Sequence, residues 1–247
     1  RLPLDEAPLP RFDLVDPGDY ADLLVQFSRG CPFDCEFCDI VTLFGRVPRT
    51  KSPGRFLREL GAVLDTGFRG TIFLVDDNFI GNRPRVRELL AALGPWQAER
   101  GYPFSFATEA SVDLGNDEEL LDLMAAANFT MVFLGLESPD PAALELAGKR
   151  QNLALEPVRA VEAIQRAGIE VTGGFIVGFD SDPPGIGEAQ RRFVERLAVP
   201  VAMLGLLTAL PRTALRDRLE REGRLVERSS GDNTGSASFN FRTAQPE

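Results

Sequence analysis

The stretch from residue 23 to residue 38 reads LLVQFSRGCPFDCEFC, and it joins a short apolar run to a loop that carries all three cysteines of the chain. Cys31, Cys35 and Cys38 follow one another at spacings of four and three residues. Three thiolates this close together are soft ligands that suit an iron–sulfur cluster or zinc, and they leave one coordination position without a cysteine. We therefore expect a metal centre directly after the first strand.

The cysteines are also compatible with a structural zinc site completed by Asp39, or with three unrelated buried thiols. A structural zinc site usually takes four strong ligands, and the 247-residue chain has no histidine and no fourth cysteine. Three cysteines cannot all pair, so a disulfide framework does not account for them. The lack of histidine also removes the usual general base, so the chemistry has to come from thiolates, carboxylates or a cofactor.

Short apolar runs alternate with helical patterns along the chain. The six runs that predict strands are 23–27, 71–75, 104–107, 131–136, 171–177 and 203–208. Ser52 and Pro53 predict a helix start, and Asn116 with Glu119 predicts another through a capping box. This alternation predicts an α/β fold with parallel strands joined by right-handed crossovers. Six units suit a partial (β/α)6 barrel of the TIM type, and also an open doubly wound sheet.

Polar side chains gather at the carboxyl ends of these strands, where a parallel barrel places its active site. They are Asp76, Asp77 and Asn78 after the second run, Glu109 after the third, Glu137 and Ser138 after the fourth, and Asp180 after the fifth. All are expected to face the cysteine loop. For Glu109 and Glu137 the alternative role is capping a helix N-terminus. Arg46, Arg49 and Lys51 are expected either to neutralise a cofactor carboxylate or to form a solvated basic turn.

The cysteine motif closely resembles the signature of the radical S-adenosylmethionine superfamily, and Phe37 fills the aromatic place before its last cysteine. The resemblance implies a [4Fe–4S] cluster on Cys31, Cys35 and Cys38, with its open iron chelated by S-adenosylmethionine. It also implies an external reducing electron donor. One electron then cleaves S-adenosylmethionine to methionine and a 5′-deoxyadenosyl radical, which abstracts hydrogen from a substrate carbon.

The resemblance further implies where the cofactor lies. The segment 76–78 stands where the family usually has Gly-Gly-Glu, which holds the methionine amino group. Glu109 and Glu137 resemble positions that contact the methionine or ribose part. Gly174 and Gly178 resemble the fifth-strand motif at which backbone approaches adenine. The residues with an implied cofactor contact are Phe37, Asp76, Asp77, Asn78, Glu109, Glu137, Gly174 and Gly178.

Within the superfamily, residues 26–40, 75–82 and 204–224 look most similar to the cobalamin-dependent radical enzymes, including hopanoid methylases. In that group a cobalamin-binding domain precedes the barrel, and a methyl group passes to an unactivated carbon. The resemblance implies a small-molecule or lipid-like substrate, with cobalamin bound only in the full-length enzyme. The expected parts are a linker from a missing upstream domain at 1–22, the barrel at 23–225, and the start of an incomplete C-terminal extension at 226–247.

The charge balance bears on the alternatives. With 27 basic and 37 acidic residues the net charge is −10, which disfavours a nucleic-acid partner because phosphate contacts supply much of such affinity. This argues against a methylthiotransferase that acts on transfer RNA. A third hypothesis is a non-enzymatic electron-carrying or zinc-stabilised module, although electron carriers generally use four cysteine ligands. No run reaches the 18 apolar residues of a transmembrane segment, and we expect a cytoplasmic protein.

Overall fold

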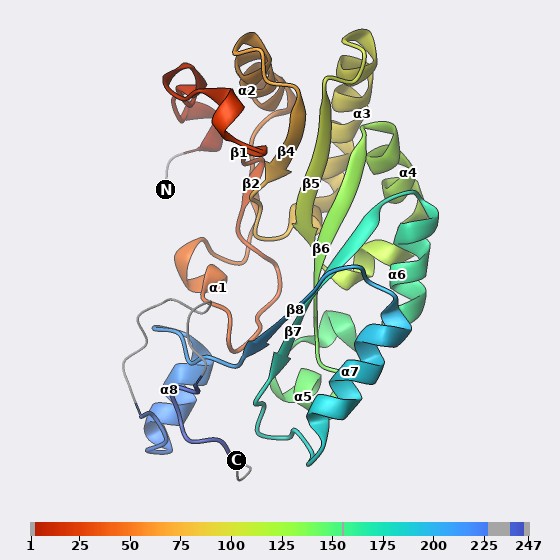
Figure 1. Ribbon diagram of the computed structural model, residues 1–247. Helices are drawn as coiled ribbons and strands as arrows, with labels where there is room; N and C mark the ends of the chain where they lie inside the picture. The colour runs from red at the N-terminus through yellow and green to blue at the C-terminus, as the bar shows by residue number, and fades with distance from the viewer. Residues whose placement is uncertain (1–2, 155, 227–237, 245–247) are drawn as a thin grey trace.

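Six parallel strands form one curved sheet in the computed structural model, which describes residues 3–154, 156–226 and 238–244 (Figure 1). The strands are β1 (Asp22–Val25), β4 (Gly70–Leu74), β5 (Phe104–Ala110), β6 (Phe129–Glu137), β7 (Glu170–Val177) and β8 (Ala202–Leu206). They lie side by side in chain order, and every pairing between neighbours is parallel. The sheet curls into a half-barrel whose two edges are β1 and β8. Because the strand order never reverses, the doubly wound alternative is excluded and the partial barrel is confirmed.

All six predicted strands are present, and their ends differ from the prediction by at most three residues. The largest difference is at β5, which continues to Ala110 because Glu109 and Ala110 still pair with Phe133 and Leu134 of β6. Glu109 therefore lies within the strand, not after it. A central strand pairs with a neighbour on each side. Its backbone pairing can therefore continue past the point where its apolar residues end.

Helices cover the convex face of the sheet (Figure 1). They are α2 (Pro53–Asp65), α3 (Arg83–Glu99), α4 (Glu118–Ala126), α5 (Pro141–Leu146), α6 (Pro157–Arg166) and α7 (Ile186–Leu197), while α1 (Ile40–Leu43) and α8 (Ala214–Arg221) lie beside the cysteine loop. The predicted cap of α2 is confirmed, because the Ser52 hydroxyl accepts the Arg55 amide. The predicted cap of α4 is wrong by one residue. Asn116 ends a 3-10 turn, Val112–Asn116, so the side chain of Asp117 caps the helix instead.

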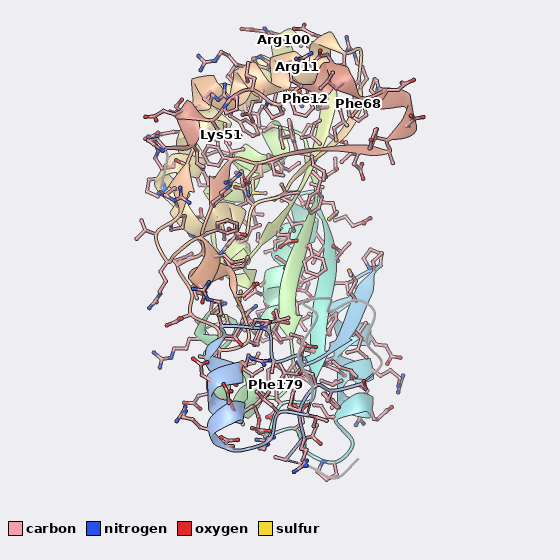
Figure 2. All side chains as sticks on the ribbon, turned by 90° about the vertical axis from the view of Figure 1, so that its left-hand side faces the viewer. Arg11, Phe12, Lys51, Phe68, Arg100 and Phe179 are labelled. Atoms are coloured by element: carbon pink, nitrogen blue, oxygen red, sulfur yellow. The ribbon has the colours of Figure 1, made fainter. Side chains whose placement is uncertain are left out.

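The buried apolar side chains form two separate cores. The larger lies between the sheet and its helices and includes Phe68, which packs near Phe12 at one end in Figure 2. The smaller contains Phe179, labelled at the other end of Figure 2, and it also includes Leu215, Leu219 and several smaller side chains. Each large side chain buried in this way contributes about 1.5–3 kcal/mol. The second core lies under the cysteine loop, since Phe37 packs against it.

The two ends of the described chain are anchored to the barrel. Residues 3–20 contain three 3-10 turns, and Leu4 is buried. The Asp5 carboxylate accepts the Ser52 amide at 2.7 Å, so the segment expected to be a linker packs against the start of α2. Near the other end, a single antiparallel bridge joins Leu225 to Phe241. Most of the extension expected from residue 226 lies outside the described residues.

None of the helices in the described ranges has the length and apolar character needed to cross a membrane.

A two-stranded ribbon fixes the beginning of the cysteine loop. Strand β2 (Ser28–Arg29) pairs in antiparallel fashion with β3 (Arg49–Thr50). The ribbon brings Gly30, at φ +104°, against the far end of the loop, where an added Cβ would lie 2.7 Å from the Gly45 carbonyl oxygen. A side chain at this position would clash, and its backbone conformation would be strained. Glycine therefore allows the loop to close directly in front of Cys31.

Candidate active site

A cavity of about 440 Å³ lies at the carboxyl ends of β4, β5 and β6, beside the cysteine loop. Its wall includes Cys31, Cys35, Phe37, Cys38, Asp76, Asp77, Asn78, Glu109, Glu137, Lys149 and Gln151. The structure thus brings together the cysteines and the polar residues expected after the second, third and fourth strands. Parallel strands place their carboxyl ends at one edge, which explains why residues 31 to 151 meet in one space.

The three thiols differ little in environment. Cys35 is buried, while Cys31 and Cys38 are half-buried. Burial raises the pKa of all three thiols, and that of Cys38 to about 11. Two amide groups point at sulfur: Asn78 Nδ2 lies 3.9 Å from Cys31 Sγ, and Gln151 Nε2 lies 3.7 Å from Cys35 Sγ. Donors of this kind favour a thiolate that is held by a metal over a neutral thiol.

The donor set fits a cluster better than a single ion. Among residues 3–154, 156–226 and 238–244, no three His, Cys, Asp or Glu side chains form a group that holds one metal ion. In a four-iron cluster each thiolate binds a different iron, so the ligands surround a larger body. The Gln151 Oε1 atom is buried and has no hydrogen-bond partner among the described residues, so this wall still has an acceptor to satisfy. Three thiols around one cavity, with two amide donors aimed at their sulfurs, fit such a group.

Asp76 and Asp77 hold the backbone of the cysteine loop. The buried Asp76 carboxylate accepts the Phe27 amide at 2.7 Å, and the Ser28 amide and hydroxyl at 2.7 and 2.6 Å. Asp77 accepts the Gly30 amide at 2.7 Å. Burial raises the pKa of Asp76 to about 7, although these three donors act against the shift. Both oxygens of Asp76 accept bonds from the chain itself, whereas Asp77 has one oxygen that accepts none from the described residues.

Glu137 forms the main ion pair of the cavity. It ends β6 at a register shift with β7, and its φ of +61° is unusual for a residue with a side chain. Its carboxylate accepts a short hydrogen bond from Lys149 Nζ. Both side chains are nearly buried. A Cβ at Gly135 would lie 2.5 Å from the Glu137 carboxylate and 2.7 Å from Lys149 Nζ, so a larger residue there would force the pair to shift.

Lys149 is kept cationic at this position. Burial lowers its pKa, but the charge of Glu137 and the nearby Cys35 outweigh that effect, and the pKa stays above its ordinary value. The Nζ atom also lies 5.9 Å from the centre of the Phe37 ring, which in turn packs against Phe179. One positive charge therefore faces the cysteines across the cavity.

Glu109, in β5, also lines the cavity. It makes no hydrogen bond or ion pair with the described residues, and burial, together with the charge of Asp77, raises its pKa. The capping alternative holds for neither glutamate, because the helices that follow them are capped by Asp117 and Asp140. A carboxylate without a protein partner on a cavity wall is available to a ligand.

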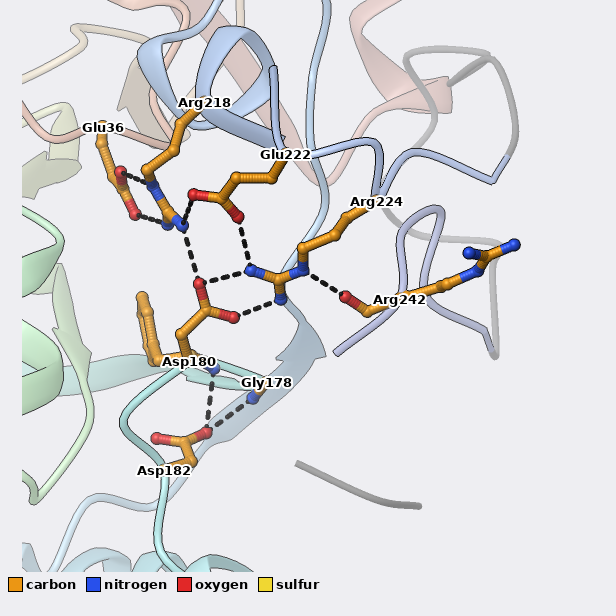
Figure 3. A network of polar contacts seen from close by, with 9 residues as sticks. Glu36, Gly178, Asp180, Asp182, Arg218, Glu222, Arg224 and Arg242 are labelled. Atoms are coloured by element: carbon orange, nitrogen blue, oxygen red, sulfur yellow. Dashed lines mark hydrogen bonds and ion pairs between the residues drawn. The ribbon is translucent and has the colours of Figure 1, made fainter. Parts of the chain in front are cut away.

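Other predicted residues lie elsewhere. Gly174 is inside β7, where a Cβ would lie 2.7 Å from the ring of Phe133. Gly178, at φ +107°, borders a separate cavity of about 420 Å³. Asp180 is bound by two arginines near α8, and this lowers its pKa (Figure 3). The Ser138 hydroxyl accepts the Asp140 amide.

The expected basic residues after the cysteine loop do not line the main cavity either. Arg46 pairs with Asp34 on the surface. Lys51 is buried against Glu59 at 2.5 Å, so it is neither a cofactor ligand at this cavity nor a solvated charge. The structure instead supplies Lys149 and Gln151, which the sequence reasoning missed. The one available signal was that Lys149 is one of only two lysines in the chain.

Fold and site together define a class: a parallel half-barrel that opens a three-cysteine loop onto a cavity at its strand ends. Residues 25–185 match the model of the Radical SAM superfamily, and the chain belongs to this superfamily. Membership implies a [4Fe–4S] cluster and S-adenosylmethionine as cofactors. Residues 213–247 match a separate model, a domain of unknown function.

Named relatives share much of the sequence. The chain is 48% identical over 239 residues to an uncharacterized methyltransferase of Synechocystis, covering 97% of this chain and 45% of that protein. It is 42% identical over 226 residues to the hopanoid C-2 methylase of Rhodopseudomonas palustris, covering 92% of this chain and 43% of that protein. The chain thus spans less than half the length of these relatives.

The fold is shared with solved structures at lower identity. The radical S-adenosylmethionine methyltransferase TsrM of Kitasatospora setae, solved with cobalamin and a [4Fe–4S] cluster, superposes with a TM-score of 0.70 at 19% identity. The match covers 85% of this chain and 38% of TsrM. At this identity the likeness shows the fold.

Proposed function

We propose that Cys31, Cys35 and Cys38 hold a [4Fe–4S] cluster and that the chain cleaves S-adenosylmethionine reductively, for methyl transfer in the full-length enzyme. The observation that carries this proposal is the single cavity that joins the three thiols to the Glu137–Lys149 pair and to Glu109. The bound cluster supplies one electron to S-adenosylmethionine, which gives methionine and a 5′-deoxyadenosyl radical.

The protein contributes charge and position around that event. Lys149 offers the cavity a fixed cation suited to the carboxylate of the methionine part, and Glu137 orients it. Glu109 and the free oxygen of Asp77 offer acceptors for the amino group or for ribose hydroxyls. Asp76 serves the site indirectly, because it ties the cysteine loop to β4. Gly174 and Gly178, which the resemblance places beside adenine, do not line this cavity, so the structure offers no support for that contact.

Methyl transfer and its substrate belong to the full-length protein. Two relatives are named methyltransferases, one of them for a hopanoid, and a structural neighbour binds cobalamin. We infer a small-molecule or lipid-like substrate, cobalamin in the full-length enzyme, and an external reducing donor. We also infer an upstream domain joined through residues 1–22, with the barrel at 23–225 and a C-terminal extension from 226.

Anaerobic reconstitution tests the central proposal. The chain is expected to hold about four iron and four sulfide, because three thiolates with one open position suit a cluster of that size. With a strong reductant it is expected to release 5′-deoxyadenosine from S-adenosylmethionine without substrate, as measured by mass spectrometry. Cys35→Ala is expected to do neither. Stoichiometric zinc without sulfide in the wild-type chain would refute the proposal.

The role of Glu137 is separable in the same preparation. Glu137→Gln removes the charge that orients Lys149, so it is expected to weaken S-adenosylmethionine binding by about tenfold, the effect of one charged hydrogen bond. The matched control is Glu145→Gln, a change on the exposed part of α5. Equal affinities of both variants in a calorimetric titration would show that Glu137 does not contribute to cofactor binding.

A further inference from the structure

Helix α8 has no assigned role, although it lies directly beside the cysteine loop (Figure 1). It opens the region that matches a domain of unknown function. Leu215 and Leu219 are its buried side chains, and they join Phe179 and Phe241 in the second core. From the same helix, the Arg218 side chain reaches Glu36 of the loop and Asp180 after β7.

Glu36, between Cys35 and Cys38, is held at all of its polar groups. Its amide donates to the Ala147 carbonyl at 2.9 Å, and its carbonyl accepts the Leu215 amide at 2.8 Å. Its carboxylate accepts two hydrogen bonds from Arg218, from Nη2 at 2.8 Å and from Nε at 3.2 Å. Glu36 does not line the cavity, so its contacts act on the backbone that carries the thiols.

Arg218 connects the loop to the rest of the barrel (Figure 3). Its Nη1 donates to Asp180 at 2.7 Å, and the same carboxylate binds Arg224 through both of its oxygens. Glu222 lies within ion-pair distance of both arginines. Arg224 Nε donates to the Arg242 carbonyl at 2.8 Å, and this ties in residues 238–244. The side chains of Glu36, Asp180, Arg218 and Arg224 are each less than a quarter exposed, so solvent screens these pairs only in part.

We propose that Arg218 is a positioning residue for the cluster, and that α8 clamps the backbone between Cys35 and Cys38 through the Glu36–Arg218 fork. The proposal rests on the proposed function, since it takes these cysteines as cluster ligands. A bidentate guanidinium–carboxylate pair fixes orientation as well as distance. Glu36 is one residue from one ligand and two from the next, so any rotation of its backbone moves both sulfurs. The clamp orders this part of the loop before the cluster binds, which reduces the entropy lost on binding.

Two variants isolate the fork. Glu36→Gln keeps Arg218 paired with Asp180, so α8 stays docked. Arg218→Lys keeps the charge but cannot form the planar fork. Arg221→Gln is the matched control on the same helix, since Arg221 is exposed and donates to its own Asp217 carbonyl. Leu93→Ala, in the larger core, lowers global stability without touching the clamp.

Two measurements read the clamp. The first is hydrogen exchange of the Glu36 and Cys38 amides in the cluster-free protein, which reports on the order of the loop. The second is iron release to a chelator from the reconstituted protein, which reports on ligation. Both fork variants are expected to accelerate each process by about tenfold, the loss of one charged hydrogen bond. The double variant is expected to be no faster than the more affected single variant, because both changes break one contact. Arg221→Gln is expected to match the wild type.

The outcomes separate the two proposals. Wild-type rates in both fork variants would overturn the clamp. The clamp would also be overturned if the exchange and iron-release rates of all variants, Leu93→Ala included, depended only on their melting temperatures. The fork would then act through global stability. If the wild-type chain binds no cluster but the amides still exchange faster in the fork variants, the clamp on the loop stands and the cluster assignment fails.

Discussion

Asp76 illustrates how a site residue differs from what its position suggests. It follows a strand and lines the cavity, as expected of a cofactor ligand, yet its oxygens accept three donors from residues 27 and 28. An unpaired buried donor costs about 1–3 kcal/mol, so these bonds give Asp76 a structural importance that its sequence position does not reveal. Asp76 therefore acts on the site through the backbone that leads into the cysteine loop.

Asp76→Asn is expected to destabilise the cluster-free chain by about 2 kcal/mol, since the amide group meets the Ser28 donors with hydrogens of its own. The effect is expected to depend on pH. The pKa of Asp76 rises from 3.8 to about 7 on folding, so its protonated form contributes stability that is complete below pH 3.8 and lost as pH rises to about 7. The stability gap between wild type and variant should therefore narrow from pH 5.5 to pH 7.5.

Urea unfolding at those two pH values measures the gap. Asp122→Asn serves as the control, because Asp122 is exposed on α4. A gap that is constant across this range would show that Asp76 does not change its protonation on folding.

Some of the other site residues could be predicted from the sequence, and others could not. Cys31, Glu109 and Glu137 were predictable, because ligand spacing and the strand-end rule are local features of the sequence. Lys149 was not, since it reaches the cavity only after α5 turns the chain back and because Gly135 leaves space for its side chain. Such a position depends on tertiary packing, which no local pattern records.

At the scale of elements, the approach of α6 to the 3-10 turn at Val112–Asn116 depends on Gly115. A Cβ there would lie 2.5 Å from the Cα of Ala160 and 2.6 Å from its carbonyl oxygen. Both neighbours are backbone atoms in a helix, so they cannot move without displacing α6. The strands and most helix starts were predictable from periodicity and caps, but this contact was not, because a glycine at a close crossing looks like any turn glycine.

Gly115→Ala is expected to lower the free energy of unfolding by about 2 kcal/mol, through overpacking of α6. The matched change is Gly61→Ala in the middle of α2, where nothing lies within 4 Å of the new Cβ. The free energy of unfolding of that variant is expected to rise by about 0.5–1 kcal/mol, because alanine loses less backbone entropy than glycine when a helix forms. Urea midpoints should move in opposite directions, and a shift of the same sign in both would contradict the role given to the close crossing.

At the scale of the whole molecule, the half-barrel followed from the sequence because six alternating units permit few topologies. The second core did not, since its members come from α5, from α8, from the loops after β7 and β8, and from Phe241. Those segments are short and widely separated, and their pairing becomes visible only in the assembled structure. The network around Asp180 was missed for the same reason.

The chain alone is expected to release 5′-deoxyadenosine but to methylate nothing, even with added cobalamin and a hopanoid as probe. A methyl donor has to be held near the substrate carbon for transfer to compete with quenching of the radical, and the chain spans less than half of its methylase relatives. Mass spectrometry of both products, in this chain and in one with its upstream sequence restored, measures the difference. Methylated product from the chain alone would disprove the need for an upstream domain.

The Glu36–Arg218 fork also sets an order of events during synthesis. The two residues are 182 positions apart, and at about 5–20 residues per second the ribosome needs roughly 9–36 s to travel from one codon to the other. The cysteines therefore emerge well before the arginine that we propose orders the segment between them. If the clamp is needed for ligation, stable cluster insertion is expected to follow the synthesis of α8, and the three thiols would have to stay reduced over that interval.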